Sequence, residues 1–277
     1  MRREIDFVKF SPTQNMTILV QTRHPVKEYA LIGSKIMSYD SVHAEQVGFI
    51  EPPNHDLAHA ALRMAGGEFC GNACMALAAH IATEEDVQPH KLLRVLLEVS
   101  GTDELVVCEV KNNGDAYVCQ VIMPLPKQIE RKTIPYADSA LDLAIIRYQD
   151  FIHIVMEVEQ YDEPTRITAQ TIAQVIGVAV GSNLTGILLY KPVTHELRTL
   201  IYVPKLDSLV WERGCGSGTA SLGAYLAWKN KTSIESAILQ PGGIIDVAAD
   251  WNNGRLATLK VSGNVNIVAR GKAFVDM

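Results

Sequence analysis

Two similar segments, separated by about half of the chain, constrain the fold of this protein more than any other feature. Residues 69–74 read FCGNAC and residues 214–219 read GCGSGT. In each segment a cysteine and a glycine precede a small polar residue, and a run of small and apolar residues with helical periodicity follows. The small polar residues, Asn72 and Ser217, are types that favour the N-cap of a helix. The pattern therefore predicts two helices that each begin just after a cysteine.

The similarity extends beyond the cysteines. Residues 14–20 and 182–188 each place an asparagine and a threonine in or ahead of an apolar run, so Asn15 is expected to correspond to Asn183. A glycine turn and a strand-like segment follow each predicted helix. A repeat with a period near half the chain favours a duplicated domain over a solenoid. We expect the two copies to meet at a cleft.

The remaining sequence predicts the fold class and the domain boundary. Short alternating apolar segments recur along the chain, whereas helical periodicity is confined to stretches after Lys27, Gly71 and Ser217 and to residues 168–176. This predicts an α+β fold in which sheets wrap around helices. The prolines of segment 123–126 disfavour continued strand pairing and mark the boundary. The predicted domains are residues 1–125 with 265–277, which carry Cys70, and residues 126–264, which carry Cys215.

Composition excludes several classes of function. The 277 residues are 48% hydrophobic, with a formal net charge of −6 and no basic block interleaved with aromatics, so nucleic acid is not an expected partner. No apolar run reaches the length of a membrane span, and the first ten residues alternate like a strand, so neither a membrane anchor nor a signal peptide is expected. Five cysteines at irregular spacing do not form a disulfide framework. We therefore expect a cytoplasmic protein.

A cysteine at the start of a helix has chemical consequences. The unpaired N–H groups and the positive end of the helix dipole favour a thiolate, and the same N–H groups bind a carboxylate. Two such helices facing one another would hold a carboxylate between two thiols. That arrangement suits the movement of a proton between the two faces of the adjacent carbon. The other cysteines, Cys74, Cys108 and Cys119, lie in apolar runs and are expected to be packing residues.

These segments, with the flanking residues, resemble a known family. The two cysteine segments, the Glu45-Gln46 pair and residues 240–243 (QPGG) look like the diaminopimelate epimerase fold family of cofactor-independent amino-acid racemases. Within it, the chain is most similar to the histidine racemases that supply staphylopine-type metallophore synthesis. The resemblance implies two pseudo-duplicated domains, each a mostly antiparallel, barrel-like sheet around a central helix. It also implies an active site in the cleft between them, no cofactor, no metal and a homodimer.

The resemblance also implies roles for individual residues. Cys70 and Cys215 would be the two catalytic bases, one removing the α-proton while the other protonates the opposite face. Glu45 would contact an imidazole side chain, and Glu212 would receive the substrate ammonium. The other expected substrate-binding residues, which include the N–H donors for the α-carboxylate, are Asn15, Gln46, Gly71, Asn72, Asn183, Gly216, Ser217 and Gly218.

Two departures bear on the substrate. Arg213 precedes Cys215 by a single intervening residue, whereas diaminopimelate epimerases have a longer stretch there, and segment 63–66 lacks the asparagine that they use for the distal group. Both departures count against diaminopimelate as the substrate. The resemblance itself favours histidine, and diaminopimelate or another amino acid is the alternative. Two other classes stay open, a redox protein in which Cys70 and Cys215 form a disulfide and a non-catalytic amino-acid-binding relative. The absence of a Cys-x-x-Cys motif weakens the first, and the presence of both cysteines weakens the second.

Overall fold

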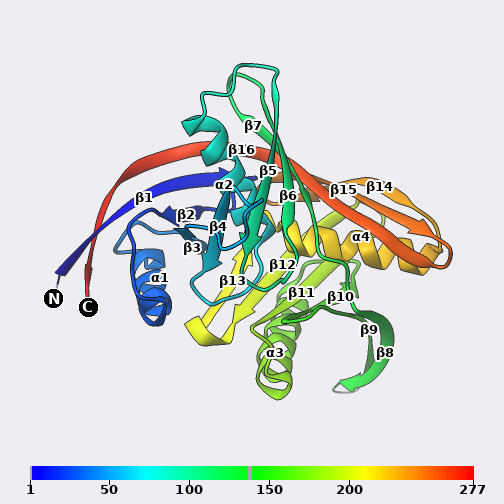
Figure 1. Ribbon diagram of the computed structural model, residues 1–277. Helices are drawn as coiled ribbons and strands as arrows, with labels where there is room; N and C mark the ends of the chain where they lie inside the picture. Colours follow the sequence, from blue (N-terminus) through cyan, green and yellow to red (C-terminus); the bar gives the residue numbers. More distant parts are fainter. Residues whose placement is uncertain (1, 137–138) are drawn as a thin grey trace. The chain divides into compact units, whose positions relative to one another are not determined.

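The computed structural model describes residues 2–136 and 139–277, and the chain divides into two compact units (Figure 1). Unit 1 comprises residues 1–122 and 262–277, and unit 2 comprises residues 123–261. Strand β16 (Arg255–Asp276) begins in unit 2 and ends in unit 1. Each unit is rich in β-strands and has two α-helices in its described residues, which confirms the predicted α+β class.

In unit 1, β1 pairs antiparallel with β2 and with the second half of β16, so the two ends of the chain lie side by side (Figure 1). β2 pairs parallel with β3, β3 antiparallel with β4, β4 parallel with β5, and β5, β6 and β7 follow as antiparallel neighbours. The strands are β1 (Arg2–Pro12), β2 (Thr17–Val20), β3 (Gln46–Glu51), β4 (Ala60–Met64), β5 (Leu92–Val99), β6 (Val106–Asn112) and β7 (Tyr117–Ile122).

Helix α2 (Gly71–Glu84) lies at the centre of unit 1 and contacts every strand from β1 to β7. Its residues are mostly small and apolar, apart from the polar Asn72 and His80, and they are buried on all sides of the helix from Gly71 to Ala82, with the exception of Ile81. A helix that is apolar all round can be stable only inside a core. The second helix, α1 (Tyr29–Met37), follows a 3₁₀ turn (Val26–Glu28) and packs on β3.

Unit 2 repeats this order of pairing. β9 pairs antiparallel with β10, β10 parallel with β11, β11 antiparallel with β12, β12 parallel with β14, and β14 antiparallel with β15. β8 extends the sheet beside β9, and β13 pairs with β12. The strands are β8 (Gln128–Tyr136), β9 (Ser139–Arg147), β10 (Phe151–Glu157), β11 (Leu184–Lys191), β12 (Glu196–Val203), β13 (Ser208–Glu212), β14 (Ile234–Gln240) and β15 (Gly243–Asn252).

Two helices pack on the sheet of unit 2. Helix α3 (Glu163–Val180) is amphipathic and packs Ala169, Ile172 and Ala173 against the core of β9–β12. Helix α4 (Gly216–Asn230) contacts β9, β10, β11, β14 and β15. A short 3₁₀ turn (Pro204–Leu206) joins β12 to β13. Among the described residues, no helix is both long enough and apolar enough to span a membrane.

The structure corrects two predictions. Asn72 and Ser217 are not N-caps, because the cysteines themselves cap helices α2 and α4. The expected correspondence of Asn15 with Asn183 is also wrong. Asn15 precedes β2, the first strand of a parallel pair, whereas Asn183 precedes β11, the second strand of the parallel pair in unit 2. The pairing order therefore matches Asn183 with Glu45, the residue before β3.

Candidate active site

Cys70 is the N-cap of α2. Its extended backbone turns the side chain back over the helix, and Sγ accepts a hydrogen bond from the Ala73 N–H at 3.3 Å. Gln46, the first residue of β3, accepts a hydrogen bond from the Cys70 thiol through Oε1. The thiol is buried, and the sulfur fills the capping role that a side-chain oxygen usually has. Two of the predicted site residues, Cys70 and Gln46, are therefore in direct contact.

Asn15 is fully buried beside the start of β2. Its Oδ1 accepts a hydrogen bond from the Thr17 hydroxyl at 3.2 Å, but within the described structure its Nδ2 has no hydrogen-bond partner. A buried amide nitrogen without an acceptor costs on the order of 1–3 kcal/mol, so such a donor calls for a ligand or water. Glu45 is half-buried next to Gln46, and its backbone N–H donates to the Met16 carbonyl at 2.8 Å.

A glycine turn after β5 supports the segment that precedes Cys70. Gly101 has a φ of 79°, and a Cβ there would stand 2.4 Å from the Phe69 nitrogen. Ser100 donates a hydrogen bond to the Glu68 carbonyl at 2.9 Å. Glu68 itself is buried. The predicted glycine turn therefore holds the entry to α2 by close backbone packing that only glycine allows.

Cys215 is the N-cap of α4 in unit 2 and has the same local geometry. Its Sγ accepts a hydrogen bond from the Gly218 N–H at 3.2 Å and lies 3.6 Å from the Ser217 hydroxyl. The Cys215 thiol is hydrogen-bonded to the carboxylate of Glu212, the last residue of β13. Both the thiol and this carboxylate are buried. Here too, the structure brings predicted site residues together.

The protonation state of Cys215 follows from this environment. Burial raises the pKa of the Cys215 thiol well above its usual range, and the negative charge of Glu212 raises it further. The hydrogen bonds from Ser217 and Gly218 oppose this shift without cancelling it. Cys215 is therefore a protonated thiol at neutral pH. Burial also raises the pKa values of Cys74, Cys108 and Cys119, which are packing residues of unit 1 as predicted.

A side chain that the sequence analysis missed holds the start of α4. Gln240, at the end of β14, accepts a hydrogen bond from the Cys215 N–H at 2.8 Å and donates one to the Thr219 hydroxyl at 2.7 Å. That hydroxyl in turn donates to the Cys215 carbonyl at 2.6 Å. Gln240 precedes the Pro-Gly-Gly turn used in the sequence comparison, but its partners are distant in sequence, so no local signal indicated this role.

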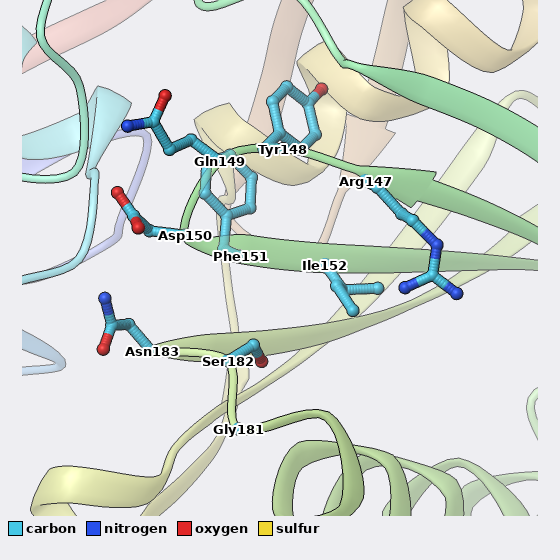
Figure 2. A pocket seen from close by; sticks show the side chains of 9 residues that line it. All are labelled: Arg147, Tyr148, Gln149, Asp150, Phe151, Ile152, Gly181, Ser182 and Asn183. Atoms are coloured by element: carbon cyan, nitrogen blue, oxygen red, sulfur yellow. The ribbon is translucent and has the colours of Figure 1, made fainter.

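Unit 2 also contains a pocket of about 210 Å³, lined by residues 147–152 and 181–183 (Figure 2). Figure 2 shows the side chains of Gln149, Asp150 and Asn183 along one side of the pocket. The Asn183 N–H donates to the Asp150 carbonyl at 2.9 Å. By strand pairing, Gln149 and Asp150 stand before β10 as Asn15 and Met16 stand before β2. Because this correspondence comes from strand pairing, no local sequence signal indicated Gln149.

The predicted site residues thus form two groups, one in each unit. Unit 1 carries Cys70, Asn15, Glu45, Gln46, Gly71 and Asn72, and unit 2 carries Cys215, Asn183, Glu212, Gly216, Ser217 and Gly218. The side chain of Arg213 is exposed and donates to the Pro241 carbonyl at 3.1 Å. Among the described residues, no group of three or more His, Cys, Asp or Glu side chains is arranged to hold a metal ion.

The fold is that of amino-acid racemases and epimerases. A probable proline racemase from Agrobacterium radiobacter K84 superimposes with a TM-score of 0.73 at 12% identity, over 99% of this chain and 92% of that chain. A hydroxyproline epimerase from Agrobacterium vitis gives a TM-score of 0.74 at 13% identity, with the same coverage. The sequence defines the family more narrowly. Residues 4–274 match the family described as "Histidine racemase CntK N-terminal domain".

Two relatives agree with this match. The chain is 32% identical to a histidine racemase of Staphylococcus aureus (strain Mu50) over 277 residues, which cover 99% of both proteins. It is 27% identical to a histidine racemase of Fusobacterium nucleatum over 273 residues, which cover 98% of this chain and 97% of the relative. The chain therefore belongs to the histidine racemase family and is an isomerase.

Proposed function

We propose that this protein racemises histidine without a cofactor or a metal, with Cys70 and Cys215 as its two bases. The proposal rests chiefly on one observation: both helices that begin with Cys-Gly are capped by the cysteine sulfur, which receives a backbone N–H. Histidine as the substrate is supported by the names of the full-length relatives. A binding protein would need neither thiol.

The chemistry requires strong electrostatic stabilisation. A thiolate takes the α-proton to form a thiol, the electron pair of the broken C–H bond delocalises into the carboxylate, and the second thiol gives its proton to the opposite face. Without an electron sink such as pyridoxal phosphate, the developing dianion depends on hydrogen-bond donors and helix dipoles. The proposed donors are the N–H groups of Gly71 and Asn72 at α2 and of Gly216 and Ser217 at α4, whereas the Gly218 N–H, which was also expected to bind the carboxylate, donates to Cys215 Sγ. Each such donor lowers the barrier by on the order of 3 kcal/mol.

The contacts of the two cysteines suggest how protons are distributed. Cys215 is a thiol in the resting protein, since burial and Glu212 raise its pKa. We assign Cys70 as the resting thiolate. Gln46 suits this change of state, because its amide can accept from a Cys70 thiol through Oε1 or, after a flip, donate to a Cys70 thiolate through Nε2. On this account Cys70 abstracts the first proton and Cys215 delivers its own.

Two side chains carry the proposed substrate preference. Glu45 precedes Gln46 and would accept a hydrogen bond from the substrate imidazole. Arg213 is the residue that a distal carboxylate would need, and its guanidinium instead donates to the Pro241 carbonyl. Glu212 would receive the substrate ammonium. A diacid such as diaminopimelate is the runner-up substrate.

The larger organisation is also part of the proposal. We propose that the two units arose by duplication, that each is a barrel-like sheet around its central helix, and that the domain boundary lies near residue 125. The recurrent order of strand pairing and the two cysteine caps support this. We further propose a cytoplasmic homodimer that supplies D-histidine to metallophore synthesis, as the resemblance implies.

Single cysteine variants test the two-base assignment. Cys70→Ser and Cys215→Ser should each abolish formation of D-histidine, since a serine alkoxide is far less accessible at neutral pH than a thiolate. Cys74→Ser is the matched control, because this buried cysteine also lies in α2 but points into the core, and it should retain racemisation if it folds. Near-normal racemisation by either Cys70→Ser or Cys215→Ser would show that the assignment is wrong.

A further inference from the structure

His153 is a fully buried histidine of β10 that the proposed proton transfer does not use. It lies behind the first turn of α4, the turn that Cys215 caps. Burial lowers its pKa to about 3, so the imidazole is neutral at physiological pH. A neutral, buried imidazole is a fixed hydrogen-bonding group, and its partners define what it does.

The hydrogen bonds of His153 identify its tautomer. Nδ1 lies 2.7 Å from the Ser221 hydroxyl, which is also 2.8 Å from the Tyr148 hydroxyl. The ring further makes a hydrogen bond to the backbone of Ser217 that favours its protonated form, so a ring N–H donates to the Ser217 carbonyl. Nε2 is buried and has no hydrogen-bond partner among the described residues. The proton therefore resides on Nδ1, and Nε2 is left as an acceptor.

The Ser217 carbonyl belongs to the same peptide group as the Gly218 N–H. A trans peptide is planar, with its C=O and N–H pointing in opposite directions. One end of this peptide accepts from His153, and the other end donates to Cys215 Sγ at 3.2 Å. Fixing the carbonyl therefore fixes the direction of the N–H. It also polarises the peptide, because hydrogen bonds in a chain strengthen one another.

The neighbouring strand leaves room for this imidazole. His153 is the register partner of Gly186 in the parallel pair β10–β11. A Cβ at Gly186 would stand 2.4 Å from Cδ2 and 2.8 Å from Nε2 of His153. Any side chain at position 186 would therefore displace the ring. The glycine at position 186 and the hydrogen bonds of the ring together hold the His153 imidazole against α4.

We propose that His153 is a positioning residue for Cys215, acting through the Ser217–Gly218 peptide to orient and polarise the N–H that stabilises the Cys215 thiolate. This inference rests on the proposed function in that it takes Cys215 as one of the two bases. Tyr148 and Ser221 complete the chain of hydrogen bonds behind the ring. Gly186 leaves the space that the His153 imidazole occupies.

The test compares two substitutions of the same buried side chain. His153→Leu removes the donor, whereas His153→Asn keeps an N–H close to the position of Nδ1. In a Cys70→Ser background, the pH dependence of Cys215 alkylation by iodoacetamide is followed by peptide mass spectrometry. We expect the leucine variant to alkylate about 3- to 10-fold more slowly at pH 7, with its midpoint shifted upward, and the asparagine variant to stay near the parent. With both cysteines present, kcat should fall by a similar factor in the leucine variant while KM changes little.

The outcomes separate this inference from the proposed function. Unchanged Cys215 alkylation in folded His153→Leu would overturn the role of His153, even if the parent protein racemises histidine. A shifted profile in a protein that lacks racemase activity would support the role and refute the proposed function. If the leucine variant does not fold, ¹⁵N NMR of the histidine-labelled parent decides. A neutral ring protonated at Nδ1 is expected for His153, and protonation at Nε2 would contradict the inference.

Discussion

At the scale of single residues, the most informative finding is that sulfur replaces oxygen as the cap of α2 and α4. The sequence pattern correctly indicated a helix after each cysteine, but it assigned the caps to Asn72 and Ser217 because cap preferences are dominated by oxygen-bearing side chains. The consequence is chemical. The backbone N–H that each sulfur accepts in the structure also stabilises a thiolate at that position.

In the proposed function, Glu45 favours histidine as the substrate and Arg213 is not needed for it. Glu45→Gln should weaken catalysis on histidine by about 10- to 150-fold, since a charge-assisted hydrogen bond is worth roughly 1.5–3 kcal/mol. Steady-state kinetics with L-histidine measures this change. Arg213→Ala is the control and should matter little, because the exposed guanidinium donates to the Pro241 carbonyl and histidine has no distal carboxylate for it to bind. Loss of activity in Arg213→Ala, together with normal activity in Glu45→Gln, would instead indicate a diacid substrate.

At the scale of elements, local patterns predicted helices better than strands. The helix predicted over residues 168–176 extends from Glu163 to Val180, because Asp162 caps it through the Thr165 N–H at 3.0 Å and Gly181 ends it with a φ of 65°. Both signals are readable in sequence. Strands are harder to predict, since short apolar runs do not reveal which strands pair with one another.

In the candidate site, too, residues within local segments could be predicted, but contacts between distant elements could not. The cysteines, glycines and Gln46 were identifiable because they cluster in recognisable segments, whereas Gln240 reaches Cys215 from another element. The expected match of Asn15 to Asn183 failed for a related reason. Similar residues preceded similar apolar runs, but the order of strand pairing, which local sequence does not contain, distinguishes β2 from β11.

The junction between β14 and α4 can be tested through Gln240. Gln240→Leu removes the acceptor of the buried Cys215 N–H and the donor to Thr219, so the free energy of unfolding should fall by about 1–3 kcal/mol. Racemisation should fall as well, because the Cys215 N–H that Gln240 holds belongs to the residue that caps α4. Chemical denaturation and activity assays measure the two effects. Gln120→Leu is a matched surface-strand control, whose amide contacts only Glu109, and it should change neither quantity strongly. Equal effects in both variants would contradict the role of Gln240.

At the scale of the whole molecule, a buried neutral histidine predicts sensitivity to acid. The folded-state pKa of His153 is about 3, below the unfolded value of 6.5, so the unfolded chain binds the proton first as the pH falls. Above pH 6.5 the neutral His153 ring contributes its full share to the free energy of unfolding, and this contribution is lost progressively as the pH falls toward 3. The loss between pH 7 and pH 5 is about 2 kcal/mol.

Urea unfolding at several pH values checks this account. His153→Asn should flatten the decline between pH 7 and pH 5, because the titrating ring is gone. His90→Asn is the control, since His90 is exposed and its positive φ of 65° suits asparagine, and it should leave the slope unchanged. An unaltered slope in His153→Asn would mean that another group, such as the partly buried His80, causes the acid sensitivity.

The two-base proposal rests on the presence of one cysteine-capped helix in each unit. Deuterium incorporation at the α-carbon tests this proposal most directly. Purified protein is incubated with L-histidine in D₂O, and both enantiomers are analysed at low conversion. Two bases predict D-histidine that carries deuterium at the α-carbon, while the remaining L-histidine keeps its original proton. Unlabelled D-histidine, or equal early labelling of both enantiomers, would contradict the assignment of Cys70 and Cys215 to opposite faces.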